Sequence, residues 1–115
     1  MLAQARQGLL DAEYAARPLD RYVQAQMSAL RAAAAIVAVR TPSRRARPGG
    51  VWASLAAVAP ELAEWSAFFA ASSATRAAAE AGVSRLVSAR DADDLVRRTS
   101  EFLVLAAHVV SGTAK

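Results

Sequence analysis

Apolar residues recur every three or four positions along nearly the whole chain, and this spacing constrains the fold more than any other feature. It is the period of one face of an α-helix, whereas a half-buried strand alternates every two residues. Alanine dominates, and together with leucine, arginine, glutamate and glutamine it gives high helix propensity. The sequence therefore predicts an all-α protein. Its 115 residues correspond to one domain, which removes about two-thirds of its unfolded surface from water.

Helical segments separated by turn residues are expected throughout residues 1–115. Their apolar stripes consist of Leu2, Ala5, Leu9, Ala12 and Ala16; Leu19, Val23, Met27, Leu30, Ala34 and Val37; Trp52, Leu55, Val58, Leu62, Trp65 and Phe69; and Leu95, Thr99, Phe102, Leu103, Ala106 and Val110. Segments of this kind with short connections most economically form a compact four- to five-helix antiparallel bundle.

Helix boundaries are marked by prolines and by one capping pattern. Pro18 suits the first turn of a helix, where its missing N–H would have no partner. Pro60 disfavours helical geometry at the preceding residue, so we expect a kink or a restart there. Ser88 followed three residues later by Asp91 resembles a capping box and predicts the start of the last helix.

A short fourth helix is expected over residues 74–81. Ser72 or Ser73 can cap its first turn, and Gly82 would end it. Three positions elsewhere stay open. Gln26 lies within an apolar stripe, either as a buried amide that needs a partner or at a solvated edge. Phe68 and Leu105 lie off the main stripes, where they cover either a dimer contact or the rim under a neighbouring helix.

A basic segment, RTPSRRARPGG, interrupts the helical pattern at about residues 40–50. Arg40, Arg44, Arg45 and Arg47 carry the formal net charge of +4, because the other ten basic residues balance the ten acidic ones. We expect a solvated connector. Its positive potential could also attract RNA, nucleotide phosphate or an acidic partner. Such contacts would be weak and indifferent to sequence, since the segment has no aromatic residue for base stacking.

Several classes of protein are disfavoured. The chain has no cysteine and one histidine, His108, which argues against disulfides, thiol catalysis and a zinc site and fits a cytoplasmic protein. Asp11 and Glu13 interrupt the apolar region that a signal peptide would need. The most apolar run, residues 32–39, is shorter than the ~20 residues that span a bilayer, so we interpret it as a buried helix and expect no membrane partner.

Cofactor and metal motifs are also lacking. The only lysine is Lys115, so no glycine-rich phosphate loop with its lysine is present. Carboxylates gather at two expected helix starts, where the helix dipole already favours them. They are Glu61 and Glu64, and Asp91, Asp93 and Asp94. We therefore predict no metal and no cofactor.

Three stretches of the sequence resemble those of a known family. Two of them are VWASLAAVAPELAEWSAFFAASSATRAAAEAG and VSARDADDLVRRTSEFL, and the third, before the basic segment, is RYVQAQMSALRAAAAIVA. The most specific pieces are APELAEW and ARDADDL. The sequence is similar to a small actinobacterial branch of the HEPN domains, named for higher eukaryotes and prokaryotes nucleotide-binding. The resemblance implies a helical bundle, often dimeric. It also implies a functional range from metal-independent ribonucleases to nucleotide-binding or regulatory modules without catalysis.

The active members of that family carry an arginine followed, after four to six residues, by a histidine. This chain departs from the pattern, because the positions at that distance before His108 are Glu101, Phe102 and Leu103. The nearest arginines, Arg97 and Arg98, lie about 15 Å or more away along an unbroken helix. They could approach His108 only across an antiparallel dimer.

The sequence thus favours a non-catalytic HEPN-like module that acts in regulation or interaction, as a homodimer or with a helical partner protein. Arg40, Arg44, Arg45 and Arg47 are the candidate contacts for nucleic acid or nucleotide. The alternative is a metal-independent ribonuclease with an atypical site formed across a dimer by Arg97, Arg98 and His108.

Overall fold

The computed structural model describes residues 2–41, 50–82 and 86–114. Within these ranges the chain forms five α-helices and one 3-10 turn, and it forms no strand. The elements are α1 (Leu2–Tyr14), α2 (Pro18–Arg40), α3 (Gly50–Val58), η1 (Pro60–Leu62), α4 (Ala63–Glu80) and α5 (Ala89–Ala114). The predicted all-α fold is confirmed.

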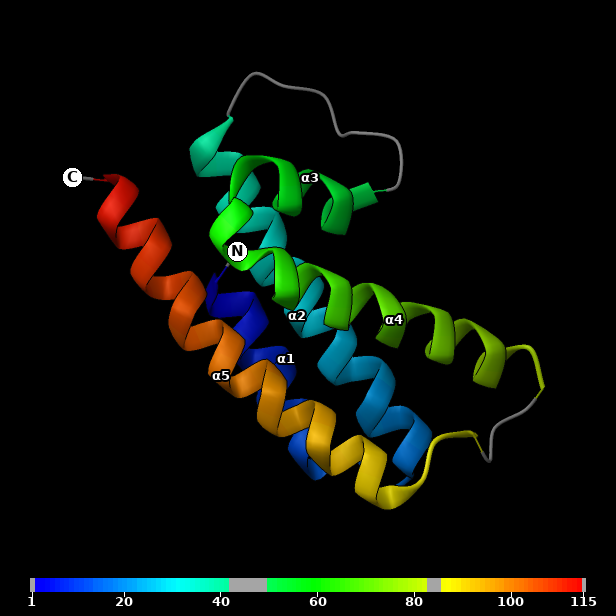
Figure 1. The fold of residues 1–115 in the computed structure, drawn as a ribbon. Coiled ribbons are helices and arrows are strands. Elements are labelled where there is room, and N and C mark those ends of the chain that lie inside the picture. Colours follow the sequence, from blue (N-terminus) through cyan, green and yellow to red (C-terminus); the bar gives the residue numbers. More distant parts are fainter. Residues whose placement is uncertain (1, 42–49, 83–85, 115) are drawn as a thin grey trace.

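The central element is α2, which contacts α1, α3, α4 and α5. The long helices α1, α2, α4 and α5 run in alternate directions along the chain (Figure 1). Helices α1 and α5 also pack against each other, as do α3 and α4. The protein is therefore a helical bundle built around α2.

The buried face of α2 consists mainly of small residues. It is formed by Tyr22, Ala25, Gln26, Ser28, Ala29, Ala32, Ala33, Ala35 and Ile36. The predicted stripe from Leu19 to Val37 was wrong as the centre of this face, because all six of its residues are only partly buried. Alanines let neighbouring helix axes approach α2 closely, so the longer side chains lie at the edges of the contact. Leu30 and Val37 still pack against the core from there.

By length and hydropathy, α2 could also span a membrane. Half of its most apolar window is buried inside the bundle, however, and the core helix of a soluble protein passes the same test. Its hydropathy is accounted for by its central position.

Large aromatic side chains fill the space between α3, α4 and α5. Trp52 stacks on Phe69 with ring centroids 5.0 Å apart, and Phe69 lies 5.1 Å from Phe102. Trp65 lies 5.6 Å from Phe102. Phe69 and Phe102 are fully buried, so the helix contacts between α4 and α5 depend on this cluster. The predicted inward positions of Trp52, Phe69 and Phe102 are confirmed.

Two predicted boundaries are also confirmed. Ala59 leaves the helical region with φ −137° and ψ 71°, and the chain restarts at Pro60 as η1 before α4. At the start of α5 the backbone N–H of Asp91 donates to Ser88 Oγ at 3.0 Å, and the backbone N–H of Ser88 donates to Asp91 Oδ2 at 3.1 Å. The reciprocal bonds are those of a capping box.

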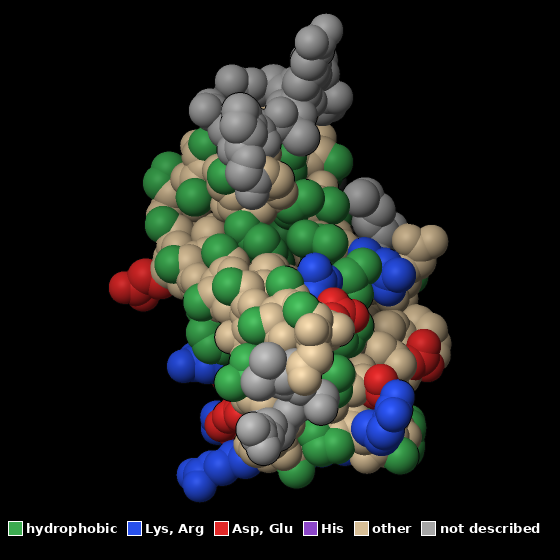
Figure 2. All heavy atoms as spheres, turned by 90° about the vertical axis from the view of Figure 1, so that its right-hand side faces the viewer, with side chains coloured by type: hydrophobic (Ala, Val, Ile, Leu, Met, Phe, Trp, Pro, Cys, Tyr) green, Lys and Arg blue, Asp and Glu red, His purple; other side chains and the backbone are tan. Residues whose placement is uncertain are grey.

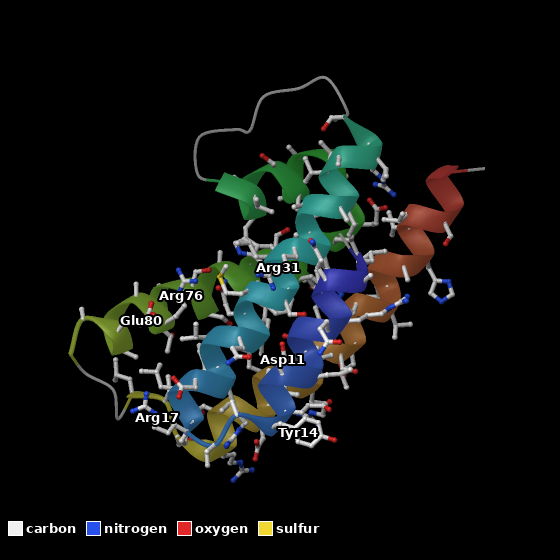
Figure 3. The ribbon with its side chains drawn as sticks, turned by 180° about the vertical axis from the view of Figure 1, so that it is seen from behind. Asp11, Tyr14, Arg17, Arg31, Arg76 and Glu80 are labelled. Carbon is white, nitrogen blue, oxygen red and sulfur yellow. The ribbon has the colours of Figure 1, made fainter. Side chains whose placement is uncertain are left out.

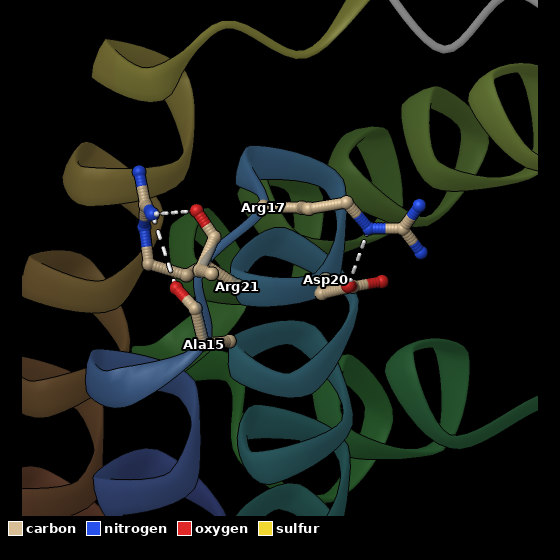
Figure 4. A network of polar contacts seen from close by, with 5 residues as sticks. Ala15, Arg17, Asp20 and Arg21 are labelled. Atoms are coloured by element: carbon tan, nitrogen blue, oxygen red, sulfur yellow. Dashed lines mark hydrogen bonds and ion pairs between the residues drawn. The ribbon is translucent and has the colours of Figure 1, made fainter.

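The connection between α1 and α2 ends the first helix earlier than its apolar stripe predicts. Arg21 donates through Nη1 to the carbonyls of Ala15 (3.1 Å) and Ala16 (3.2 Å), which satisfies two acceptors beyond the helix end (Figure 4). Arg17 is extended at φ −90° and ψ 139°, as expected for a residue before proline. Ala16 therefore lies outside α1, in the turn.

The expected short helix over residues 74–81 was wrong, because α4 runs without interruption from Ala63 to Glu80. The Ser72 hydroxyl donates to the Phe68 carbonyl at 3.0 Å, and Thr75 bonds the Ala71 carbonyl in the same way. Hydroxyls satisfied by the preceding turn allow the helix to continue. The helix ends close to Gly82, whose φ is +126°.

Candidate functional site

The histidine and the two candidate arginines of α5 lie on one continuous helix. Arg97 precedes His108 by eleven positions and Arg98 precedes it by ten, which corresponds to about 16 Å and 15 Å along the axis. All three residues are exposed. Within one chain the structure does not bring these arginines to His108.

Each of the two arginines has an acidic neighbour one turn away. Arg97 Nη2 lies 3.4 Å from Asp94 Oδ1, and Arg98 Nη1 lies 3.8 Å from Glu101 Oε1. The Arg98 guanidinium also lies over two aromatic rings, 5.5 Å from the centroid of Phe68 and 5.9 Å from that of Trp65. Arg98 thus covers the edge of the aromatic cluster, with Phe68 37% exposed beside it.

Arg40, the first candidate of the basic segment, is the last residue of α2 and has a structural partner. Its Nη1 donates to the Val58 carbonyl at 3.0 Å, and its Nη2 lies 2.8 Å from Glu61 Oε2. The hydrogen bond from Arg40 lowers the pKa of Glu61, and Glu61 raises the pKa of Arg40. The guanidinium therefore ties the end of α2 to the α3–η1 connection. The other three candidates, Arg44, Arg45 and Arg47, lie outside the described residues.

Gln26 forms the centre of a polar cluster that joins α2 to α4. Its side chain is 1% exposed. Its Nε2 donates to Ser73 Oγ, and its Oε1 accepts a 2.9 Å hydrogen bond from Arg76 Nη1. Arg76 Nε lies 3.5 Å from Glu80 Oε1, one turn further along α4 (Figure 3). Of the two alternatives for Gln26, the buried amide with a partner is correct.

A groove of about 570 Å³ opens beside this cluster, between α2, α3 and α4. Its lining is mostly small and apolar, with the polar residues Gln26, Ser66, Ser73 and Arg76 among them. The remaining lining residues are Leu30, Gly50, Val51, Trp52, Ala53, Ala56, Ala63, Ala67 and Ala70. A largely apolar concavity with a few polar groups is the usual form of a small-ligand site.

Besides Arg76 Nε, whose only partner is the ion pair with Glu80, two polar groups of the lining residues have no hydrogen-bond partner among the residues that the structure describes. They are the indole N–H of Trp52 and the hydroxyl of Ser66, and their residues are 7% and 4% exposed. Buried polar groups are normally paired, so two orphans beside one groove need an explanation.

Among the described residues, no three or more histidine, aspartate or glutamate side chains lie close enough together to hold a metal ion. The carboxylates at the start of α5 include Asp91, which accepts the Ser88 N–H, and Asp93, which lies 3.2 Å from Arg21 Nε. Asp94 lies beside Arg97.

The sequence matches the family described as SAV_6107-like HEPN over residues 12–107. The chain belongs to this HEPN family. The match includes α2 to α4 and most of α5, and it stops one residue before His108. No curated protein and no solved structure gave a significant match. The resemblance to HEPN domains that the sequence indicated is confirmed.

Sequence reasoning missed Arg76 in this HEPN domain. The misplaced boundary at Ser72 and Ser73 hid the continuous register that puts Ser73 and Arg76 on one face of α4, three residues apart. The available signal was Gln26, because a glutamine within an apolar stripe demands a polar partner on the facing helix.

Proposed function

We propose that this HEPN domain is a non-catalytic module that works by binding, with its basic segment as the contact for RNA phosphates. The proposal depends on one observation. Arg97 and Arg98 stand about three turns of continuous helix away from His108 and have acidic neighbours of their own. A phosphodiester would need arginine and histidine within reach of the same group.

The contact itself is assigned to Arg44, Arg45 and Arg47. The charge balance of the chain supports this assignment, since the net charge of +4 equals the charge of these residues plus Arg40. Glu61 compensates the charge of Arg40. A triple variant in which the three remaining arginines become alanine is therefore the informative change.

Binding of a fluorescently labelled single-stranded RNA, measured by anisotropy at increasing salt, tests this assignment. The wild-type protein should bind weakly, and its affinity should fall steeply with salt, as expected for phosphate contacts. The triple variant should lose most of this affinity. A control variant with Arg6, Arg90 and Arg97 changed to alanine removes the same charge from exposed helical positions, and it should bind RNA much more tightly than the triple variant. Equal RNA binding by the wild-type protein and the triple variant would leave the basic segment as a connector only.

A homodimer is part of the proposal, and an exposed apolar face supports it. Leu10 of α1 is 49% exposed and Val104 of α5 is 58% exposed. Both line a shallow cavity of about 370 Å³ between α1 and α5. Val104→Glu should shift the sedimentation coefficient to that of a monomer. An exposed site on another face, Ala71→Glu, should leave the dimer intact.

One observation favours the ribonuclease alternative. Arg97 and His108 differ by about 20° around α5 at 100° per residue, so they lie on one exposed face with Val104 between them. Two copies of α5 that cross antiparallel would bring the arginine of one copy to the histidine of the other. Mixing Arg97→Ala with His108→Ala protein should then restore about a quarter of the wild-type cleavage, because one mixed dimer site is intact. Cleavage that survives each single substitution would exclude this site.

A further inference from the structure

The groove between α2, α3 and α4 combines a mostly apolar lining with one cationic side chain, and the proposed RNA contact does not involve it. Arg76 is the only charged residue in the part of its lining that the structure describes, and no carboxylate lines it there. The Arg76 side chain is 27% exposed, so its guanidinium is within reach of a ligand. Figure 2 shows one face of the molecule, on which hydrophobic side chains gather above most of the charged ones.

Arg76 is held in place rather than free. Its Nη1 donates to the buried Gln26 amide, and its Nε lies beside Glu80. A guanidinium has five N–H donors in a fixed fork, so these contacts leave donors for a further acceptor. Because Glu80 offsets part of its charge, the site suits one negative charge better than two.

The first turn of α3 adds a second source of positive potential. Gly50, Val51, Trp52 and Ala53, the first four residues of the helix, all line the groove. The first four N–H groups of a helix have no partner within it, and the helix dipole adds positive potential at that end.

The lining residues Trp52 and Ser66 supply an independent observation. Their indole N–H and hydroxyl are donors without a partner in the described residues, and both residues are more than nine-tenths buried. Both atoms are themselves almost fully covered, so they lie behind the surface of the groove, and a ligand oxygen would reach them only after a change of side-chain rotamer.

We propose that this groove binds a small amphipathic monocarboxylate, with its carboxylate toward Arg76 and its hydrocarbon chain over the alanines of α3 and α4. The alanines create the space, since Ala53, Ala67 and Ala70 leave room that larger side chains would fill. The volume of about 570 Å³ lies within the range of small-molecule sites. This inference does not depend on the proposed function, because it invokes none of the arginines of the basic segment.

Decanoate, used below its micelle concentration, is a suitable probe, and the indole ¹H–¹⁵N signals of the two tryptophans report on it. Trp52 lines the groove and Trp65 does not, so titration should shift the Trp52 signal in a saturable way and leave that of Trp65 nearly unchanged. Decanol, without charge, and decyltrimethylammonium, with the opposite charge, should bind at least about tenfold more weakly.

Two variants localise the site. Ala67→Leu fills the groove from an exposed helical position and should abolish the shift, whereas Ala71→Leu, exposed on the same helix outside the lining, should preserve it. Arg76→Gln should weaken decanoate by about tenfold and leave decanol unaffected, with Arg90→Gln as the charge-matched control. If Arg76→Gln fails to fold, the Ala67 and Ala71 pair still decides whether this groove is the site.

Three results would overturn the proposal. The first is a Trp52 signal that decanoate does not move. The second is equal affinity for decanol or decyltrimethylammonium, which would show that no anion is recognised. The third is unchanged binding by Ala67→Leu. None of these measurements involves RNA, so their failure is independent of the RNA-binding assay.

Discussion

Arg76 Nη1 lies 2.9 Å from the Oε1 atom of Gln26, and this bond joins a half-buried cation on α4 to a buried amide on the central helix. Ser73 accepts the other end of the same amide. Both polar ends of Gln26 are thereby satisfied in a site that is 1% exposed. The contact fixes the position of α4 over α2 and the position of the guanidinium beside the groove.

Gln26→Ala should destabilise the protein by about 2–3 kcal/mol, because it leaves Ser73 and Arg76 without their partner and opens a small cavity. Urea unfolding followed by circular dichroism measures the change. Gln24→Ala removes the same side chain from an exposed position of the same helix and should cost less than about 0.5 kcal/mol. A similar loss in both variants would mean that the polar cluster does not stabilise the fold.

Ser88→Ala should cost about 1 kcal/mol, since it removes the acceptor of the Asp91 N–H at the start of α5. Thermal or urea unfolding detects a change of this size. Ser111→Ala, at an exposed position near the other end of α5, is the matched control and should be nearly neutral. If the two substitutions have the same effect, the reciprocal bonds at Ser88 contribute nothing to stability.

The ion pair of Arg40 and Glu61 predicts a pH dependence. The pKa of Glu61 is lowered from 4.5 by the hydrogen bond from Arg40, so the folded state favours the ionised carboxylate. The stabilisation is present above about pH 4.5 and is lost as the pH falls through the lowered folded value. Glu61→Gln should therefore reduce the unfolding free energy more at pH 7 than at pH 3. An effect of equal size at both pH values would show that the charge of Glu61 is not what matters.

Phe102→Ala should destabilise the protein by about 3–5 kcal/mol, enough to unfold much of the population of a small domain. The Phe102 ring is fully buried and lies 5.1 Å from Phe69 and 5.6 Å from Trp65. Loss of near-ultraviolet circular dichroism and a low unfolding midpoint report the effect. Phe68→Ala, at a ring that is 37% exposed, should cost much less. Comparable losses would contradict the central place of Phe102 in the aromatic cluster.

The sequence predicted helix boundaries correctly where a residue restricts the backbone or bonds to it. Pro60 forces the preceding residue out of the helix, and Ser88 with Asp91 forms the cap that its spacing implies. Ser72 and Ser73 misled the prediction because a serine hydroxyl can bond either a helix start or the preceding helical turn. In this structure Ser72 makes the second kind of bond, to the carbonyl of Phe68.

The buried face of α2 was harder to predict than that of α5. Helix α5 has one inward face, and its predicted residues Leu95, Thr99 and Phe102 are buried. Helix α2 has neighbours on several sides, so its fully buried positions are mostly alanines such as Ala29 and Ala32, and Ile36 is the exception among its larger aliphatic side chains. The position of the groove and of Arg76 beside it depends on how α3 and α4 cross α2. The apolar periodicity along one helix does not predict how helices cross.

The central claim is that this HEPN domain binds RNA without cleaving it. A cleavage assay with a labelled single-stranded RNA and the purified protein tests this claim most directly. With EDTA present, wild-type protein and His108→Ala should both leave the RNA intact over hours, at the rate of a buffer control. Cleavage by the wild-type protein that disappears in His108→Ala would contradict the account and establish a ribonuclease site on α5.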